Sequence, residues 1–522
     1  MSDRSSRARP EPSNPVTPAQ DLQGALSELL AGGAVQVYED GELLAELSAP
    51  AEVSFAQDSA SGSSALQYEV KQQGHAAFLH LWSEERNLTR RVLRVVEHSA
   101  DGLVLEVQRF GKSKPGQLEF SRSEGRGPGR MTREKFRARF ARLLAEQFPD
   151  EETESLTSAP DLEHSFSGSY TRGVLCRGQR AWAVLGVSGA EDASTIDAAL
   201  TYGLLWLDWA RMHAGRRVVE GLRMILPEGA ARVTAHRLQA IISDANIALY
   251  ELSEATLRFR KVDPRDAGNL DTWLTPRREV EATRAAAQDA VQRVQRLAPD
   301  AIDAIVPPGT REVALRFRGL EFARWRNGEL RLNWPGSGHA SVEEALKELA
   351  TFRNALATDK NHPLYRASPE RWLETTALAD ITRIDPRLDP KHVYPQVPAL
   401  SGTGTTSAGA GRGVIDLLGV TRDGRVAVIE LKASEDIHLA LQGMDYWLRV
   451  RWHLQQGDFQ RYGYFTGVEL QHKPPLLYLV APGLRFHPAT DVLLRYVSPE
   501  VEPVRVGLNE EWRRGIQVVF RQ

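Results

Sequence analysis

Three ionisable side chains interrupt an apolar stretch near the carboxyl end of the sequence. Residues 414–420 and 426–431 are two apolar runs, and Asp416, Glu430 and Lys432 lie within or directly after them. Two neighbouring carboxylates are unfavourable in an apolar setting unless a cation neutralises them. Carboxylates are oxygen ligands that suit Mg²⁺, and such an ion polarises a phosphoryl oxygen and activates water. A nearby lysine offsets the charge that develops at phosphorus. These residue types therefore predict metal-dependent hydrolysis of phosphodiesters.

The two apolar runs must form a hairpin for this chemistry to occur. Residues 422–425 read Arg-Asp-Gly-Arg, and Asp-Gly between apolar runs is a strong hairpin signal. Glu430 and Lys432 are two apart on a strand and therefore share one face. A two-residue turn at Asp423-Gly424 would pair Asp416 with Leu431, on the wrong face. We therefore expect a bulge or a three-residue loop, which brings Asp416 opposite Glu430 or Lys432.

This stretch resembles the PD-(D/E)XK nuclease superfamily, which includes RecB-type nucleases, many restriction enzymes and junction resolvases. Asp416 matches the acid on the first strand, and Glu430-Leu431-Lys432 matches the (D/E)-x-K tripeptide. Glu374 matches an acid on the first helix, and Gln442 matches a glutamine on the helix after the motif. The proline that precedes the first acid in the family is absent. The resemblance covers about residues 363–522 and implies a restriction-endonuclease-like αβββαβ core.

The resemblance also implies roles for these residues. Asp416, Glu430 and Glu374 would bind Mg²⁺ or Mn²⁺, Lys432 would position the attacking water, and Gln442 would support them. The substrate would be nucleic acid, most simply DNA. Two alternatives remain open. The charged trio could only brace the hairpin, or the chain could bind nucleic acid or assemble with partners without turnover. Glu-x-Lys alone is not specific, because Glu69-Val70-Lys71 repeats it in a context that indicates surface strand charge.

A second copy of the same pattern, without its acids, precedes the first. The segment from Ile196 aligns with the segment from Ile437 at an offset of 241 residues, and residues 180–188 align with 425–433 at an offset of 245. In this alignment Leu185 stands for Glu430, Val187 for Lys432, Thr201 for Gln442 and about Thr171 for Asp416. Loss of the charged groups on a retained apolar skeleton predicts an internal duplication with one degenerate site. Different strand orders in the two halves would contradict it.

The remaining patterns predict a multi-domain α/β protein. We expect a disordered tail at 1–18, a β-rich domain at 19–118, a linker around 111–129, the degenerate nuclease-like domain at 130–256, a helical connector with a β-hairpin at 257–360, and the nuclease-like domain at 361–522. The connector hairpin is expected at Asn327-Gly328, between strands near 313–317 and 330–334. Residues 401–413 are rich in glycine but lack the ending of a phosphate loop.

Composition excludes several classes of protein. The 522 residues carry a net charge of −3, so binding to nucleic acid through bulk positive charge is excluded. The single cysteine, Cys176, rules out an intrachain disulfide and a cysteine-based zinc site. No apolar run approaches the ~20 residues that cross a bilayer, and the amino terminus lacks a secretory signal. We therefore expect a cytoplasmic protein with no membrane partner.

Overall fold

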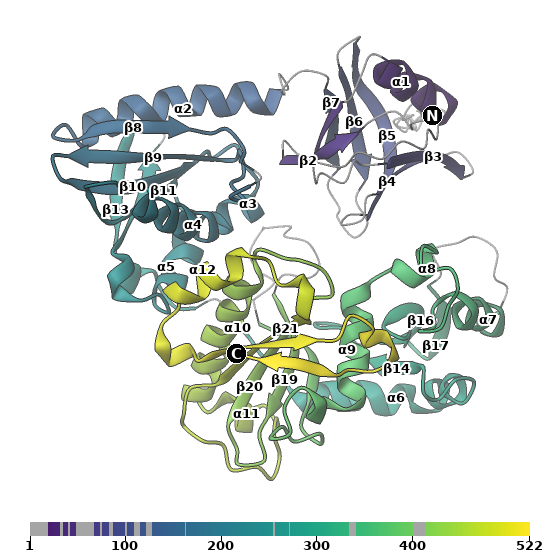
Figure 1. Cartoon of the computed structure of the whole chain (residues 1–522). Helices are drawn as coiled ribbons and strands as arrows, with labels where there is room; N and C mark the ends of the chain where they lie inside the picture. Colours follow the sequence, from purple (N-terminus) through teal and green to yellow (C-terminus); the bar gives the residue numbers. More distant parts are fainter. Residues whose placement is uncertain are drawn as a thin grey trace, which may run out of the picture. The chain divides into compact units, whose positions relative to one another are not determined.

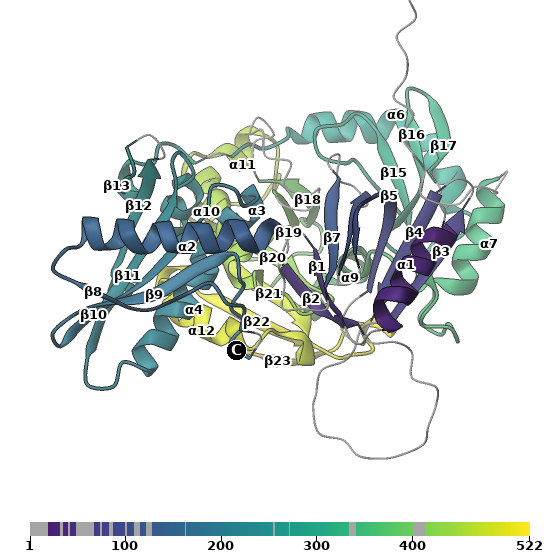
Figure 2. The same ribbon diagram turned by 90° about the horizontal axis from the view of Figure 1, so that it is seen from above.

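The computed structural model describes residues 19–31, 35–39, 42–47, 67–73, 76–82, 87–99, 102–108, 115–121, 128–161, 163–253, 256–270, 272–333, 341–399 and 413–522. Over these ranges the protein is a mixed α/β chain with four mostly antiparallel sheets (Figures 1 and 2). The residues divide into two compact units, one built mainly from the chain before Gly173 and the other mainly from the chain after Ile196. The predicted tail at 1–18 and most of the glycine-rich stretch at 401–413 lie outside the described residues.

The first unit begins with an antiparallel sheet of order β2-β1-β7-β6-β5-β4-β3. The elements are α1 (Ala19–Ala31), β1 (Val35–Glu39), β2 (Glu42–Leu47), β3 (Gln67–Gln73), β4 (Ala76–Trp82), β5 (Asn87–Ser99), β6 (Gly102–Gln108) and β7 (Gly116–Ser121). Leu22, Leu26 and Leu29 of α1 lie on one helix face and join the sheet's core. Strand β7 occupies part of the predicted linker, because Leu118 and Phe120 alternate into that core.

A second sheet follows, with the order β13-β12-β11-β10-β9-β8. Its elements are α2 (Pro128–Gln147), β8 (Glu152–Thr157), β9 (Tyr170–Arg177), β10 (Arg180–Val187), α3 (Ala193–Asp197), α4 (Ala199–Met212), β11 (Val218–Pro227), α5 (Arg232–Leu238), η1 (Ser243–Ala245), β12 (Ile247–Ser253) and β13 (Arg258–Val262). Strands β11 and β12 are parallel, and β12 and β13 are antiparallel. The helix α4 packs on β11.

The connecting segment forms a small antiparallel sheet beside a long helix. Its elements are η2 (Pro264–Asp266), α6 (Arg277–Gln295), β14 (Ile302–Ile305), β15 (Val313–Phe317), β16 (Leu320–Arg326), β17 (Glu329–Leu332), α7 (Val342–Phe352) and α8 (Pro363–Arg366). The Asn327-Gly328 turn joins β16 to β17, not β15 to a strand near 330. A further strand, β16, fits in between because β15 turns back tightly at Arg318-Gly319, where both residues have positive φ.

The last sheet has the order β18-β19-β20-β21-β22-β23. Its elements are α9 (Pro369–Ala379), η3 (Ile381–Arg383), β18 (Tyr394–Pro398), β19 (Val414–Val420), β20 (Val426–Leu431), α10 (Leu439–Gln455), α11 (Asp458–Arg461), β21 (Leu476–Pro482), η4 (Gly483–Arg485), α12 (Ala489–Tyr496), η5 (Pro499–Val501), β22 (Pro503–Leu508), η6 (Trp512–Arg514) and β23 (Val518–Arg521). From α9 to β21 the main elements succeed each other as helix, three strands, helix and strand, which agrees with the predicted order.

The two large helices of this region cover opposite faces of the sheet. Trp372 and Leu373 of α9 pack with Leu476, Tyr478 and Val480 of β21. A Cβ on Gly443 of α10 would instead meet the side chains of Leu477 and Leu479. Because neighbouring strand residues point to opposite faces, α9 and α10 lie on different sides. Leu417, Ile429 and Leu431 pack on the α9 side, so Glu430, which alternates with Ile429 and Leu431 on β20, points to the α10 side.

The two six-stranded sheets share one strand order. Matching β8 with β18 and continuing along the chain to β13 and β23 gives the same neighbours in both sheets. The pairs β11–β12 and β21–β22 are both parallel, and the last pair of each sheet is antiparallel. A helix connects β10 to β11 and β20 to β21, and a shorter helix follows β11 and β21. The outcome that would have contradicted a duplication is therefore not observed.

Candidate functional site

The hairpin of β19 and β20 has the register that the predicted site requires. Leu418 pairs with Val428 and Val420 with Val426. The N–H of Thr421 donates to the carbonyl of Arg425 at 2.8 Å, which closes a loop of the three residues 422–424. Gly424 takes a positive φ of 88° there, a conformation that suits glycine. The expected three-residue loop is thus confirmed, and Asp416 falls on the same face as Glu430.

Asp416 and Glu430 are buried close together at the end of this hairpin. The Leu431 N–H donates to Asp416 Oδ2 at 3.0 Å, so this backbone N–H is paired with a side-chain carboxylate and not with a carbonyl of the neighbouring strand. The Glu430 side chain is 1% exposed, and Asp416 is 14% exposed. Glu430 Oε1 lies 3.6 Å from Lys432 Nζ. Its other oxygen, Oε2, is buried and has no hydrogen-bond partner among the described residues. The pair therefore contains one buried oxygen able to accept a ligand.

Burial shifts both carboxyl groups toward the neutral form, and a neighbouring carboxylate adds to each shift: Glu374 for Asp416 and Asp416 for Glu430. Burial raises the pKa of Asp416 to about 6, against the lowering effects of Arg371 and of the Leu431 N–H. Burial raises the pKa of Glu430 well above its ordinary value, and the charge of Asp416 adds to the rise. These are the changes expected when two carboxylates share an apolar site without a neutralising cation. A bound divalent cation would reverse them, because it favours the ionised forms.

Lys432 remains a cation in this setting. Burial acts to lower its pKa, but the carboxylates of Glu430 and Asp436 raise it above the ordinary value. Asp436 Oδ2 lies 3.2 Å from Lys432 Nζ, four residues farther along the loop between β20 and α10. The Lys432 side chain is 16% exposed, so it links the buried pair to the surface. It is therefore a hydrogen-bond donor and a positive charge, and not a proton acceptor.

Gln442 approaches the site from α10 through Tyr446. Its Nε2 donates to the hydroxyl oxygen of Tyr446 at 3.2 Å, and the Gly413 N–H donates to the same oxygen at 3.3 Å. Burial, and after it the charge of Glu430, raise the pKa of the Tyr446 hydroxyl. The influence of Glu430 shows that this hydroxyl and the carboxylate pair share one neighbourhood. Gln442 is thus placed beside the predicted site and held by Tyr446.

Glu374 is placed differently from the other acids. It lies on α9, on the opposite side of the sheet, and both of its oxygens already have partners. Arg316 Nη1 donates to Oε1 at 2.9 Å, and Arg371 Nη1 donates to Oε2 at 2.5 Å. Gln396 Nε2 lies 3.2 and 3.3 Å from the two oxygens. Arg371 Nη1 also reaches Asp416 Oδ1 at 3.4 Å, so an arginine links Glu374 to the pair.

This arrangement constrains the metal that could bind. In the part of the chain that the structure describes, no cluster of three or more His, Cys, Asp or Glu side chains is arranged to hold an ion. Asp416 and Glu430 nevertheless fit a hard cation, since they are adjacent carboxylates with one unpartnered buried oxygen. Glu374 would have to leave two arginines to join them. A metal here would have two side-chain ligands, and its other positions would be free for water and phosphate.

The middle sheet presents apolar or small polar residues at the matching positions. Leu185, Val187, Thr171 and Thr201 are all buried. The helix alignment needs a shift of one residue, however. A Cβ on Gly203 would contact Leu222 and Met224, as one on Gly443 would contact Leu477 and Leu479. Because α4 and α10 begin 240 residues apart, Tyr202, not Thr201, corresponds to Gln442.

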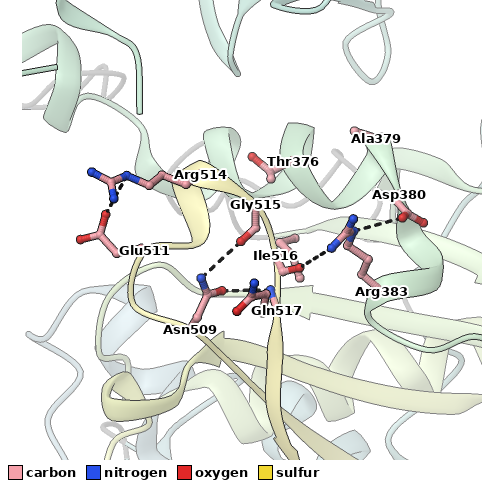
Figure 3. Close-up of a pocket in the computed structure, with 10 residues that line it drawn as sticks. All are labelled: Thr376, Ala379, Asp380, Arg383, Asn509, Glu511, Arg514, Gly515, Ile516 and Gln517. Atoms are coloured by element: carbon pink, nitrogen blue, oxygen red, sulfur yellow. Dashed lines mark hydrogen bonds and ion pairs between the residues drawn. The ribbon is translucent and has the colours of Figure 1, made fainter. Parts of the chain in front are cut away.

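A pocket elsewhere on the same unit offers a less promising site. Figure 3 shows it between α9 and the chain after β22, lined by Thr376, Ala379, Asp380, Arg383, Asn509, Glu511, Arg514, Gly515, Ile516 and Gln517. Its polar groups are already engaged: Arg383 with Asp380 and the Ile516 carbonyl, and Asn509 with Gly515 and Gln517. None of these lining residues is a predicted site residue.

Several residues of the site were missed by sequence reasoning. Arg371 lies one helical turn before Glu374 on α9, so a search for opposite charges at that spacing could have found it. Asp436 follows Lys432 by four residues in a loop, where that rule gives no signal. Tyr446 is a buried aromatic residue, and its hydroxyl accepts hydrogen bonds from Gln442 Nε2 and the Gly413 N–H. Arg316 lies 58 residues before Glu374 and gave no local signal.

Comparison with known proteins gives no further guide. No protein-family model, curated protein or solved structure gives a significant match to this chain. None of the helices in the described ranges has the length and apolar character needed to cross a bilayer.

Proposed function

We propose that the protein is a metal-dependent nuclease that hydrolyses phosphodiester bonds of DNA, with its site at the end of the β19–β20 hairpin. The observation that carries the proposal is the buried pair of Asp416 and Glu430, with an unpartnered carboxylate oxygen and a protonated lysine beside it. The element order from α9 to β21 and the positions of Asp416, Glu430 and Lys432 support a restriction-endonuclease-like core. The shared strand order supports the middle sheet as a degenerate copy.

Each residue of the site has its own role in the proposed hydrolysis. Asp416 and Glu430 would hold Mg²⁺ or Mn²⁺, and the ion would supply charge for the phosphoryl oxygen and acidify bound water. Lys432, as a protonated donor, orients the attacking water and offsets negative charge at phosphorus. Gln442 and Tyr446 form the polar wall on the α10 side. Glu374 keeps Arg371 in place beside Asp416. Hydrolysis forms one P–O bond to the oxygen of water and breaks one to a sugar oxygen, which gains a proton as water loses one.

The exposed parts of the site define where a substrate would approach. Glu430 is almost fully covered, whereas Asp416, Lys432 and Arg371 are 14%, 16% and 27% exposed. A phosphate could therefore reach Lys432 and Arg371 directly, and both carry the charge that attracts it. The Glu430 carboxylate lies deeper than these cations, where a metal ion would complete the contact.

The test is cleavage by the whole chain. Wild type, Lys432→Ala and the matched control Lys473→Ala, which removes an exposed lysine, are incubated with duplex, single-stranded and junction DNA in Mg²⁺, Mn²⁺ or EDTA. Loss of the Lys432 ammonium should reduce cleavage at least about 100-fold, while Lys473→Ala should cleave like wild type. Equal activity of Lys432→Ala and wild type would remove the assignment. Tight DNA binding by wild type without cleavage would favour the non-catalytic nucleic-acid-binding alternative, to which the capture of Glu374 by two arginines lends weight.

A further inference from the structure

The two nuclease-like halves meet through equivalent elements. Helix α4 of the middle half packs on α12 of the last half, and α5 of the middle half packs on α10 of the last. In the duplication, α4 corresponds to α10 and α5 to α12. Exchanging the halves therefore turns one contact into the other. This is the property of an isologous, two-fold interface, normally made by two copies of one chain.

The backbone hydrogen bonds between the two halves show the same two-fold symmetry. After α5 and α12 the chain pairs in a short antiparallel bridge between Ile241 and Val497. The Ser498 N–H donates to the Ala240 carbonyl at 2.8 Å, and the Ile242 N–H donates to the Tyr496 carbonyl at 2.9 Å. A shift of 256 residues converts Ala240 into Tyr496 and Ile242 into Ser498, so it exchanges these two bonds.

The same shift holds beyond the bridge. Strands β12 and β22 begin at Ile247 and Pro503, which are 256 residues apart. The residues before them, Asn246 and Glu502, both have a φ of 46°, a left-handed conformation that non-glycine residues seldom adopt. Two such residues at matching positions are not expected of unrelated segments. The equivalence of the halves around the interface thus rests on backbone geometry and not only on sequence.

Ion pairs also join the equivalent helices, although their residues do not lie at positions related by the shift. Arg237 of α5 binds Asp445 of α10 in a bidentate pair, with Nε–Oδ1 at 2.9 Å and Nη2–Oδ2 at 2.6 Å, and both side chains are largely buried. Arg495 of α12 binds Asp208 of α4 at 3.0 and 3.1 Å. Each half therefore gives an arginine from its second helix to an aspartate on the first helix of the other. The α10–α12 face of the last half is occupied by this internal counterpart.

We infer that the chain is an internal two-fold dimer with one acid-bearing site, and that it cuts a single strand of duplex DNA at each encounter. This inference rests on the proposed nuclease function. The strands of a duplex are related by two-fold axes, so a symmetric enzyme presents one site to each strand. Here Leu185 and Val187 replace Glu430 and Lys432 in the other half, and the face through which a second copy would supply another site is already filled.

The experiment follows the products of supercoiled plasmid over time with the intact wild-type chain in Mg²⁺ or Mn²⁺, beside Lys432→Ala. Sedimentation velocity at the same protein concentration gives the oligomeric state. We expect a monomer that converts the plasmid first to open circles, with linear DNA appearing only after many nicks per molecule, and neither product with Lys432→Ala.

The results that would overturn the inference differ from those that would overturn the proposed function. Linear DNA that appears with open circles from the earliest times would overturn the single-strand inference and leave the nuclease proposal standing. A stable dimer would overturn the claim that the pairing face is filled. Absence of any cleavage by wild type, under conditions where the chain is folded and monomeric, would overturn the proposed function and the nicking activity with it.

Discussion

Replacing Asp416 with asparagine should stabilise the metal-free protein at alkaline pH and leave it unchanged at acid pH. The carboxyl of Asp416 has a pKa of about 6 in the folded protein and an ordinary value of 3.8. The folded chain therefore binds more protons between these pH values than the unfolded chain does. The contribution of this carboxyl to the free energy of unfolding is therefore largest below about pH 4 and falls as the pH rises through 6. Asparagine carries no proton to lose, so the variant avoids this fall.

The size of the effect follows from the shift. A difference of two pKa units corresponds to about 3 kcal/mol, since each unit is worth about 1.4 kcal/mol. Because the compact unit that holds Asp416 has more than 300 residues, that is only about 4 °C in the midpoint of thermal unfolding. Glu430→Gln should change stability in the same direction, because burial raises the pKa of Glu430 as well. An exposed aspartate, Asp266, provides the control, and Asp266→Asn should have no such effect.

The assay is calorimetry at pH 4, 6 and 8 in EDTA, repeated at pH 8 with Mg²⁺. Magnesium should raise the midpoint of wild type and not that of Asp416→Asn, because only ionised carboxylates bind the ion. If Asp416→Asn proved less stable than wild type at pH 8 in EDTA, the carboxylate would be bracing the hairpin. Our account of the pair as a strained cation site would then be wrong.

Two further predictions concern the surroundings of the pair. Arg371→Met removes a charge that lowers the pKa of Asp416. Mg²⁺-dependent cleavage by wild type should rise with pH through about 6, and the variant's profile should rise at a higher pH. An unmoved or lower midpoint would contradict the ion-pair argument. Gly424→Ala would place a Cβ 2.0 Å from the Glu469 carbonyl oxygen at a positive φ, and should lower the free energy of unfolding by about 2–4 kcal/mol. Gly467→Ala, also at positive φ but with open space around it, should cost only about 1 kcal/mol in a denaturation experiment; similar losses in both would refute the steric part of the reasoning.

Local chemistry made the hairpin predictable from the sequence. Strand alternation gave the shared face of Glu430 and Lys432, and the need to bring Asp416 to that face required the three-residue loop that the structure shows. A helix that carries Gln442 was also expected after the motif, and α10 is that helix.

The partners of Glu374 could not be predicted in the same way. Arg316 comes from a different sheet, and nothing in the spacing of β15 and α9 says that they meet. Sequence patterns identify an acid on a helix, but tertiary packing decides whether a metal or an arginine faces it. The extra strand β16 was missed for a related reason: the tight turn at Arg318-Gly319 puts an arginine at positive φ, which its residue type does not suggest.

Glu374 and Glu430 are two buried acids of one domain with very different surroundings. Glu374 has the features of a structural ion cluster, since two arginines and a glutamine satisfy both its oxygens. Glu430, equally buried, has a second carboxylate for a neighbour, one lysine at 3.6 Å and an oxygen with no partner in the described structure. A half-satisfied buried carboxylate costs stability that an apolar residue would not, and the matching position of the other half holds Leu185. On the proposed duplication, the fold accommodates an apolar residue at that place, and a bound cation would offset the cost of burying the two acids.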